Sequence, residues 1–131
     1  MITEKEKEVY FMYNLITITG VNHYLGMKAF KVGRVLRIVK EKENEYDDEA
    51  IYVELPIIGK VGYVANSTDT VYSGTQSAGR LYDSIGERAY VKAIVITRSS
   101  VIAEMISEQE YPVYDKMFAL DGIDTEEEIG F

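Results

Sequence analysis

The stretch Tyr90-Val-Lys-Ala-Ile-Val-Ile-Thr97 decides the fold class, because it is the strongest β-strand pattern in the chain. β-Branched and aromatic side chains fill most of its positions, and these residue types are typical of strands. A polar turn follows at Arg98–Ser100, and the next six residues, Val101–Ile106, are apolar enough to pair back on the first strand. The sequence therefore predicts a β-hairpin at this point.

Further strands are expected upstream of the hairpin, each bounded by turn residues. The candidates are Leu15–Thr19, Val32–Val39, Ala50–Leu55 and Ile58–Val64. The Val32–Val39 stretch is apolar on both faces, which suits a strand of a small barrel, where both faces are partly covered. With the hairpin, this pattern predicts five or six strands.

One short helix is expected between Ile58–Val64 and the hairpin. Ser77 is suited to be its N-cap, Leu81 and Ile85 are spaced as neighbours on one helix face, and Gly86 is suited to end it. The expected fold class is therefore mainly β, a barrel or sandwich of five or six strands with one or two short helices.

Length and charge indicate one domain followed by an acidic tail. The chain has 131 residues, which suits a single domain, and its net charge is −8. Residues 9–103 carry eleven Lys/Arg against ten Asp/Glu, whereas residues 104–131 carry only Lys116 against nine acids. We therefore divide the chain into an N-terminal segment, 1–13, a β-domain, 14–106, and an acidic, aromatic-containing tail, 107–131, in which Tyr111–Leu120 is expected to pack on the domain or on a partner chain.

Composition argues against several classes of function. The absence of cysteine excludes disulfides, thiolate metal sites and cysteine nucleophiles, and the only histidine is His23. No nucleophile elbow and no phosphate-binding P-loop sequence occurs. The acidic run from Glu41 to Glu49 lacks the glycine of a calcium-binding loop, so a solvated turn is expected there. We expect no enzyme activity, no metal and no cofactor.

Localisation is indicated by what the sequence lacks. Met1–Glu8 has no apolar region of the kind found in a signal peptide, and no apolar run is long enough to span a bilayer. A cytoplasmic protein without membrane contact is expected.

Tyrosine usage is more informative, because the chain has eleven tyrosines and no tryptophan. Tyr24, Tyr46 and Tyr63 each lie at an expected turn or strand end, beside glycine or polar residues. Aromatic side chains in such places stack on bases or line a ligand pocket. The alternative is that they simply cover the ends of the β-domain.

Three sequence blocks resemble the HIRAN domain family. They are Gly20-Val-Asn-His-Tyr-Leu-Gly26, then Asn44-Glu-Tyr-Asp-Asp-Glu-Ala-Ile51, and then Gly59-Lys-Val-Gly-Tyr-Val64. The blocks follow one another in the family's order, and the resemblance covers about residues 14–97. It implies a small SH3/OB-like β-barrel with short helices, and a module that binds the free 3′ end of single-stranded DNA.

The resemblance also implies roles for individual residues. Tyr46 takes the position of the aromatic that stacks on a terminal base, and Asp47 that of the carboxylate that accepts a hydrogen bond from the terminal 3′-hydroxyl. Tyr24 matches the second member of an aromatic pair, and His23 replaces the first. Tyr63 takes a position that is tyrosine or histidine in relatives.

Two positions depart from the DNA-binding members of the family. Asn22 stands where they carry arginine, and Asn66 stands where they carry lysine. Each lost cation removes a phosphate contact and its counterion release, so weaker DNA binding is expected. Arg80 and Lys60 are candidates to replace the missing charge.

Two alternatives therefore stay open at this point. In one, the domain keeps the fold but serves as a protein-interaction or homo-oligomerisation module, with the tail as the contact. In the other, the acidic tail covers the DNA pocket as a mimic of nucleic acid.

Overall fold

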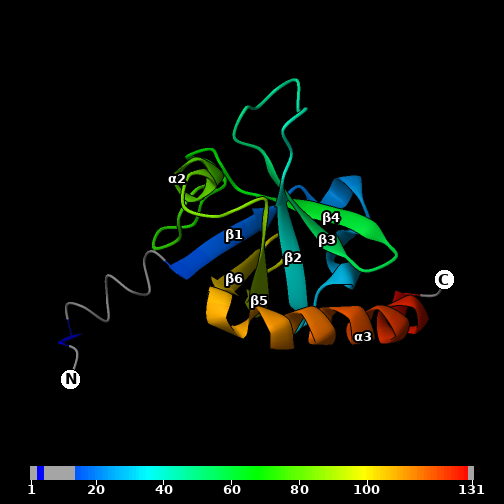
Figure 1. Cartoon of the computed structure of the whole chain (residues 1–131). Coiled ribbons are helices and arrows are strands. Elements are labelled where there is room, and N and C mark those ends of the chain that lie inside the picture. Colours follow the sequence, from blue (N-terminus) through cyan, green and yellow to red (C-terminus); the bar gives the residue numbers. More distant parts are fainter. Residues whose placement is uncertain (1–2, 5–13, 130–131) are drawn as a thin grey trace.

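The computed structural model describes residues 3–4 and 14–129, and Figure 1 shows the chain. The strands are β1 (Leu15–Thr19), β2 (Val35–Lys40), β3 (Ile51–Leu55), β4 (Gly59–Val64), β5 (Arg88–Ile96) and β6 (Val101–Met105). The helices are α2 (Ala78–Tyr82) and α3 (Tyr111–Ile129), together with the short 3-10 helices η1 (Val21–His23), η2 (Gly26–Ala29) and η3 (Glu108–Glu110). Most of the predicted N-terminal segment, 1–13, lies outside the described residues.

The six strands form a closed barrel in the order β1-β4-β3-β2-β5-β6. Every neighbouring pair is antiparallel, and β1 closes the barrel because it pairs with β4 on one side and β6 on the other. The predicted hairpin is present as β5 and β6. The predicted fold class, a small mainly-β barrel, is confirmed.

Strand β2 has apolar contacts on both faces, as its sequence predicts. Leu36 and Ile38 belong to the cluster that fills the barrel. Val35 points the other way and packs with Tyr90 and Phe118 in a second cluster outside the barrel wall. Two buried faces explain why this strand lacks a simple alternation of polar and apolar residues.

Helix α2 is shorter than the predicted helix. Ser77 is its N-cap, since its hydroxyl accepts a hydrogen bond from the Arg80 backbone N–H at 3.3 Å. The helix ends at Tyr82, however, and a turn closed by the Ser84 N–H on the Leu81 carbonyl replaces the expected last turn. The stop assigned to Gly86 was therefore wrong, because the chain leaves the helix one turn earlier.

Helix α3 is a long element that the sequence did not predict. It has 19 residues and covers the outer face of β2 and β5, where Phe118 is buried (Figure 1). The Phe118 ring lies edge-on to the Tyr90 ring, with 5.8 Å between the two centroids. The Arg37 guanidinium also contacts this ring, at 4.7 Å from the Phe118 centroid. The loop between β2 and β3 projects from the opposite end of the barrel in Figure 1, so the described part of the tail does not cover that loop.

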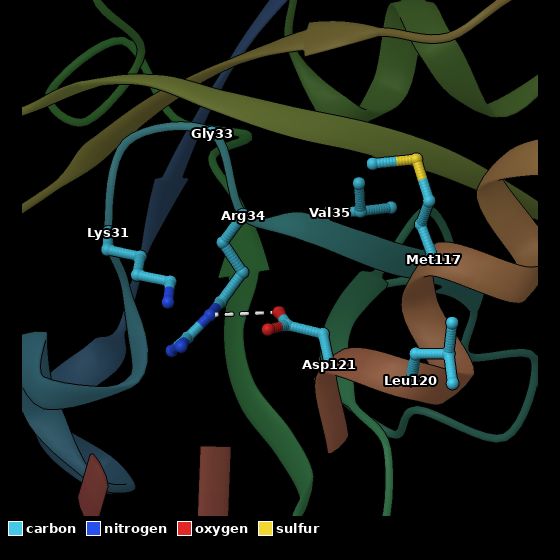
Figure 2. A pocket seen from close by; sticks show the side chains of 7 residues that line it. All are labelled: Lys31, Gly33, Arg34, Val35, Met117, Leu120 and Asp121. Carbon is cyan, nitrogen blue, oxygen red and sulfur yellow. Dashed lines mark hydrogen bonds and ion pairs between the residues drawn. The ribbon is translucent and has the colours of Figure 1, made fainter. Parts of the chain in front are cut away.

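A hollow of about 290 Å³ lies where α3 meets the start of β2. Figure 2 shows the Arg34 guanidinium beside the Asp121 carboxylate, with Nε and Oδ2 at 3.1 Å. The Arg34 side chain is fully buried, and its Nη1 also donates to the Ala29 carbonyl at 2.9 Å. Met117 and Leu120 of α3 also line the hollow, together with Lys31, Gly33 and Val35. This ion pair and the Phe118 contact together attach α3 to the barrel.

The packing of α3 predicts a large loss of stability on replacing Phe118 with alanine. The substitution Phe118→Ala removes a buried ring, which usually costs about 3–5 kcal/mol of the free energy of unfolding. Val113→Ala is the matched control, since Val113 lies on the same helix and is 60% exposed. Chemical denaturation measures both variants. A loss for Phe118→Ala that is no larger than for Val113→Ala would contradict the described packing.

Candidate functional site

Two glycines shape the end of the barrel where β1 meets β4. Gly20 ends β1 with φ +72°, in the left-handed region that favours glycine, and turns the chain into η1. Gly62 lies on β4, and a Cβ at this position would come within 2.9 Å of the Thr19 carbonyl oxygen. This close approach sets Tyr63 beside the turn, with its ring centroid 6.4 Å from that of Tyr24. Two predicted site residues therefore lie together.

Glu41 connects this aromatic pair to a cation. The Tyr63 hydroxyl donates to the two Glu41 carboxylate oxygens, at 3.0 Å and 2.9 Å. Lys60 Nζ donates to Oε2 of the same carboxylate at 2.5 Å, and it lies 4.8 Å from the ring centroid of Tyr52. Asn44 Nδ2 donates to Oε1 at 2.9 Å. Glu41 is thus the centre of a hydrogen-bonded cluster.

The cluster fixes the protonation of its members. Burial raises the pKa of Glu41, but the hydrogen bonds from Lys60, Asn44 and Tyr63 outweigh burial, so its pKa is lowered overall. The hydrogen bond to Glu41 raises the pKa of Lys60. Burial, and then the bond to Glu41, raise the pKa of Tyr63 far above its ordinary value. At neutral pH the cluster therefore contains a carboxylate, an ammonium group and a protonated phenol.

Asn44 also orders the loop that carries Tyr46 and Asp47. Its Oδ1 accepts hydrogen bonds from the backbone N–H groups of Tyr46, at 2.8 Å, and Asp47, at 2.9 Å. This arrangement is an Asx-turn, in which an asparagine side chain replaces a backbone acceptor. The turn leaves Tyr46 94% exposed, with its ring free of the barrel core.

Asp47 is held in place from the other side by Asn66. Asn66 Nδ2 donates to Asp47 Oδ2 at 3.1 Å, and Asn66 Oδ1 accepts from the Gly79 backbone N–H at 2.7 Å. The second carboxylate oxygen of Asp47 accepts from the Glu49 N–H at 2.9 Å. Asn66 therefore links the loop to α2. It does so at the position where the resemblance would place a lysine.

Asn22 and His23 lie in η1 and line a different hollow. It measures about 320 Å³ and includes Asp69 and Tyr72 among its lining residues. The structure therefore divides the seven predicted site residues into two groups. Five are connected by the ring contact and hydrogen bonds described above, namely Tyr24, Tyr46, Asp47, Tyr63 and Asn66. The other two face the separate hollow.

Sequence reasoning missed the central role of Glu41. It placed this residue in a solvated acidic turn, although the carboxylate bonds to three side chains. Asn44 carried a usable signal, since asparagine two and three residues before the bonded N–H groups is the spacing of an Asx-turn. Lys60 was expected as a possible source of positive charge, and the structure places it in the cluster, paired with Glu41.

Among residues 3–4 and 14–129, no group of three or more His, Cys, Asp or Glu side chains is arranged to hold a metal ion. Within the same residues, no helix combines the length and apolar character needed to cross a membrane.

Comparison with known proteins gives two solved structures of the same fold. A structural genomics protein from Lactobacillus plantarum superposes with a TM-score of 0.52 at 23% identity, over 70% of this chain and 88% of that one. The HIRAN domain of human HLTF superposes with a TM-score of 0.51 at 15% identity, over 89% of this chain and 88% of that one. No family model and no curated protein sequence matches the chain.

On this evidence, the chain has the fold of a HIRAN domain.

Proposed function

We propose that this chain is a non-catalytic module that binds the 3′ end of single-stranded DNA. The observation that carries the proposal is the Asx-turn of Asn44, which presents an exposed tyrosine directly beside a carboxylate held by Asn66. A terminal nucleotide offers the two matching groups, a base that stacks and a hydroxyl that donates.

Tyr46 supplies the stacking surface in this proposal. Its side chain is 94% exposed, so no barrel contact has to be broken before a base covers the ring. Stacking of a base on an aromatic side chain contributes about 1–3 kcal/mol. The Tyr24 and Tyr63 pair gives a second aromatic surface at the same end of the barrel.

Asp47 supplies discrimination between strand ends. Its two oxygens each accept one hydrogen bond from the protein, and a carboxylate oxygen can accept a second one. A 3′-hydroxyl can donate to it, whereas a 3′-phosphate would bring a second negative charge against the carboxylate. The site therefore favours an end over the interior of a strand, where a phosphate follows every sugar.

Binding in this proposal is modest and depends weakly on salt. Asn66 is uncharged and bonds to Asp47 and Gly79, and the Lys60 ammonium group is already paired with Glu41, so neither side chain supplies an unpaired positive charge to phosphate. Because each phosphate contact adds to the salt dependence of binding, few contacts give a shallow slope.

Fluorescence anisotropy with a 5′-labelled single strand tests end recognition. We expect the wild type to prefer a 3′-hydroxyl over a 3′-phosphate by roughly ten- to a hundred-fold, the value of a hydrogen bond to a charged group. Asp47→Asn should remove most of this preference, because it removes the charge that repels phosphate. Asp48→Asn is the matched control and should keep it, since Asp48 is the exposed neighbour. Equal affinity of the wild type for both ends would contradict end recognition.

Protein interaction through α3 is the second candidate function. Val113, Met117 and Leu120 are 60%, 44% and 68% exposed, and their spacing places them on one face of the helix. Apolar side chains gathered in this way are typical of a contact with another protein chain. A second copy of this chain is the simplest partner to test.

Sedimentation tests the self-association form of this candidate. We expect association at micromolar concentration that Met117→Glu abolishes, because a carboxylate in an apolar contact is strongly unfavourable. Val95→Glu is the matched control, since Val95 is 45% exposed but lies on β5 outside the α3 stripe. A monomer at all concentrations, or an equal effect of both variants, would contradict self-association through α3.

A further inference from the structure

Glu41 is an unexpected residue to find at a site for an anionic ligand. Its side chain is only 18% exposed, and it lies between the Tyr24–Tyr63 pair and the Asn44 turn that carries Tyr46. A partly buried carboxylate here adds negative charge where DNA phosphates would approach. Its position therefore needs an explanation beyond a solvated turn.

The partners of Glu41 are the kinds of group that bind phosphate. An ammonium group, a phenol hydroxyl and an amide N–H all donate to its two oxygens, at 2.5–3.0 Å. Lysine and tyrosine side chains and amide donors are typical ligands of phosphate oxygens in nucleic-acid complexes. Glu41 thus occupies these donors.

Lys60 shows the consequence for charge most directly. Its ammonium group is 2.5 Å from Glu41 Oε2, so the pair is locally neutral, and the Tyr52 and Tyr63 rings lie 4.8 Å and 5.9 Å from it. A phosphate that approaches Lys60 would have to displace the carboxylate or accept its repulsion. An uncharged nucleoside end meets no such barrier.

From these contacts we propose that Glu41 is a specificity-determining residue: an internal counter-ion that takes the place of a ligand phosphate at Lys60 and Tyr63. It restricts the site to the uncharged end of a strand and keeps affinity for internal phosphates low. This inference rests on the proposed function and adds a second source of end selection to that of Asp47.

The substitution Glu41→Gln tests the inference, because glutamine retains an amide oxygen that can accept from Tyr63 and Asn44 but carries no charge. Glu43→Gln is the matched control: it makes the same change in net charge at an exposed position two residues away. Anisotropy is measured for the full chain with 3′-hydroxyl and 3′-phosphate single strands over a range of salt concentrations, and thermal melting checks that the variants fold.

We expect Glu41→Gln to bind the 3′-phosphate strand at least about tenfold more tightly than wild type at low salt, the value of one charge-assisted contact. Its slope of log affinity against log salt should steepen by about 0.7, as for one added phosphate contact on a single strand. Glu43→Gln should change neither quantity by as much. Adding Lys60→Met to Glu41→Gln should abolish the gain, because Lys60 is the released cation.

Two results would overturn the inference. An equal gain in Glu41→Gln and Glu43→Gln would assign the effect to net charge alone. Weaker binding by a folded Glu41→Gln variant would assign Glu41 a purely structural role in the Asn44 turn. Either result leaves a wild-type preference for the 3′-hydroxyl standing. A different combination separates the two proposals. If the wild type binds both ends equally but Glu41→Gln binds the 3′-phosphate strand about tenfold more tightly, end recognition is overturned, whereas the role of Glu41 as an internal counter-ion stands.

Discussion

Closure of the barrel by β1 is the constraint on which the rest of the structure depends. Strand β1 has only five residues, yet it pairs with β4 and with β6, and without it the sheet would have two open edges. The approach of β4 is so close that Gly62 has no room for a Cβ beside the Thr19 carbonyl. The same contact sets Tyr63 against the turn at Gly20. Fold and candidate site are thus joined at one point of backbone packing.

Polar bonds then extend order from this point to the loop between β2 and β3. Tyr63 bonds to Glu41, Glu41 to Asn44, and Asn44 to the backbone of Tyr46 and Asp47. Asn66 closes the chain of contacts from the α2 side. This loop has no regular secondary structure and is ordered by the Asn44 and Asn66 side chains. Each of them uses its amide nitrogen as a donor and its amide oxygen as an acceptor to different partners. Such preorganisation reduces the entropy lost when a ligand binds.

The sequence predicted the strands well because their signal is local. The alternation of Leu15–Thr19 and the apolar run from Tyr90 are visible without any partner. It did not predict α3, whose apolar side chains are divided between a face on the barrel, with Phe118, and an exposed face, with Leu120. The role of Glu41 was not predictable either, because Lys60 and Tyr63 on β4 reach it only once β2, β3 and β4 lie side by side in the barrel.

Mapping the surface that a strand end contacts tests the central claim most directly. In an NMR titration of the ¹⁵N-labelled chain with a short 3′-hydroxyl single strand, the account predicts the largest amide shifts at Tyr46, Asp47 and Tyr63. Gly79 should also shift, since its N–H bonds to the Asn66 side chain that holds Asp47. Shifts confined to α3, or no shifts in the loop between β2 and β3 at saturating strand, would contradict the account.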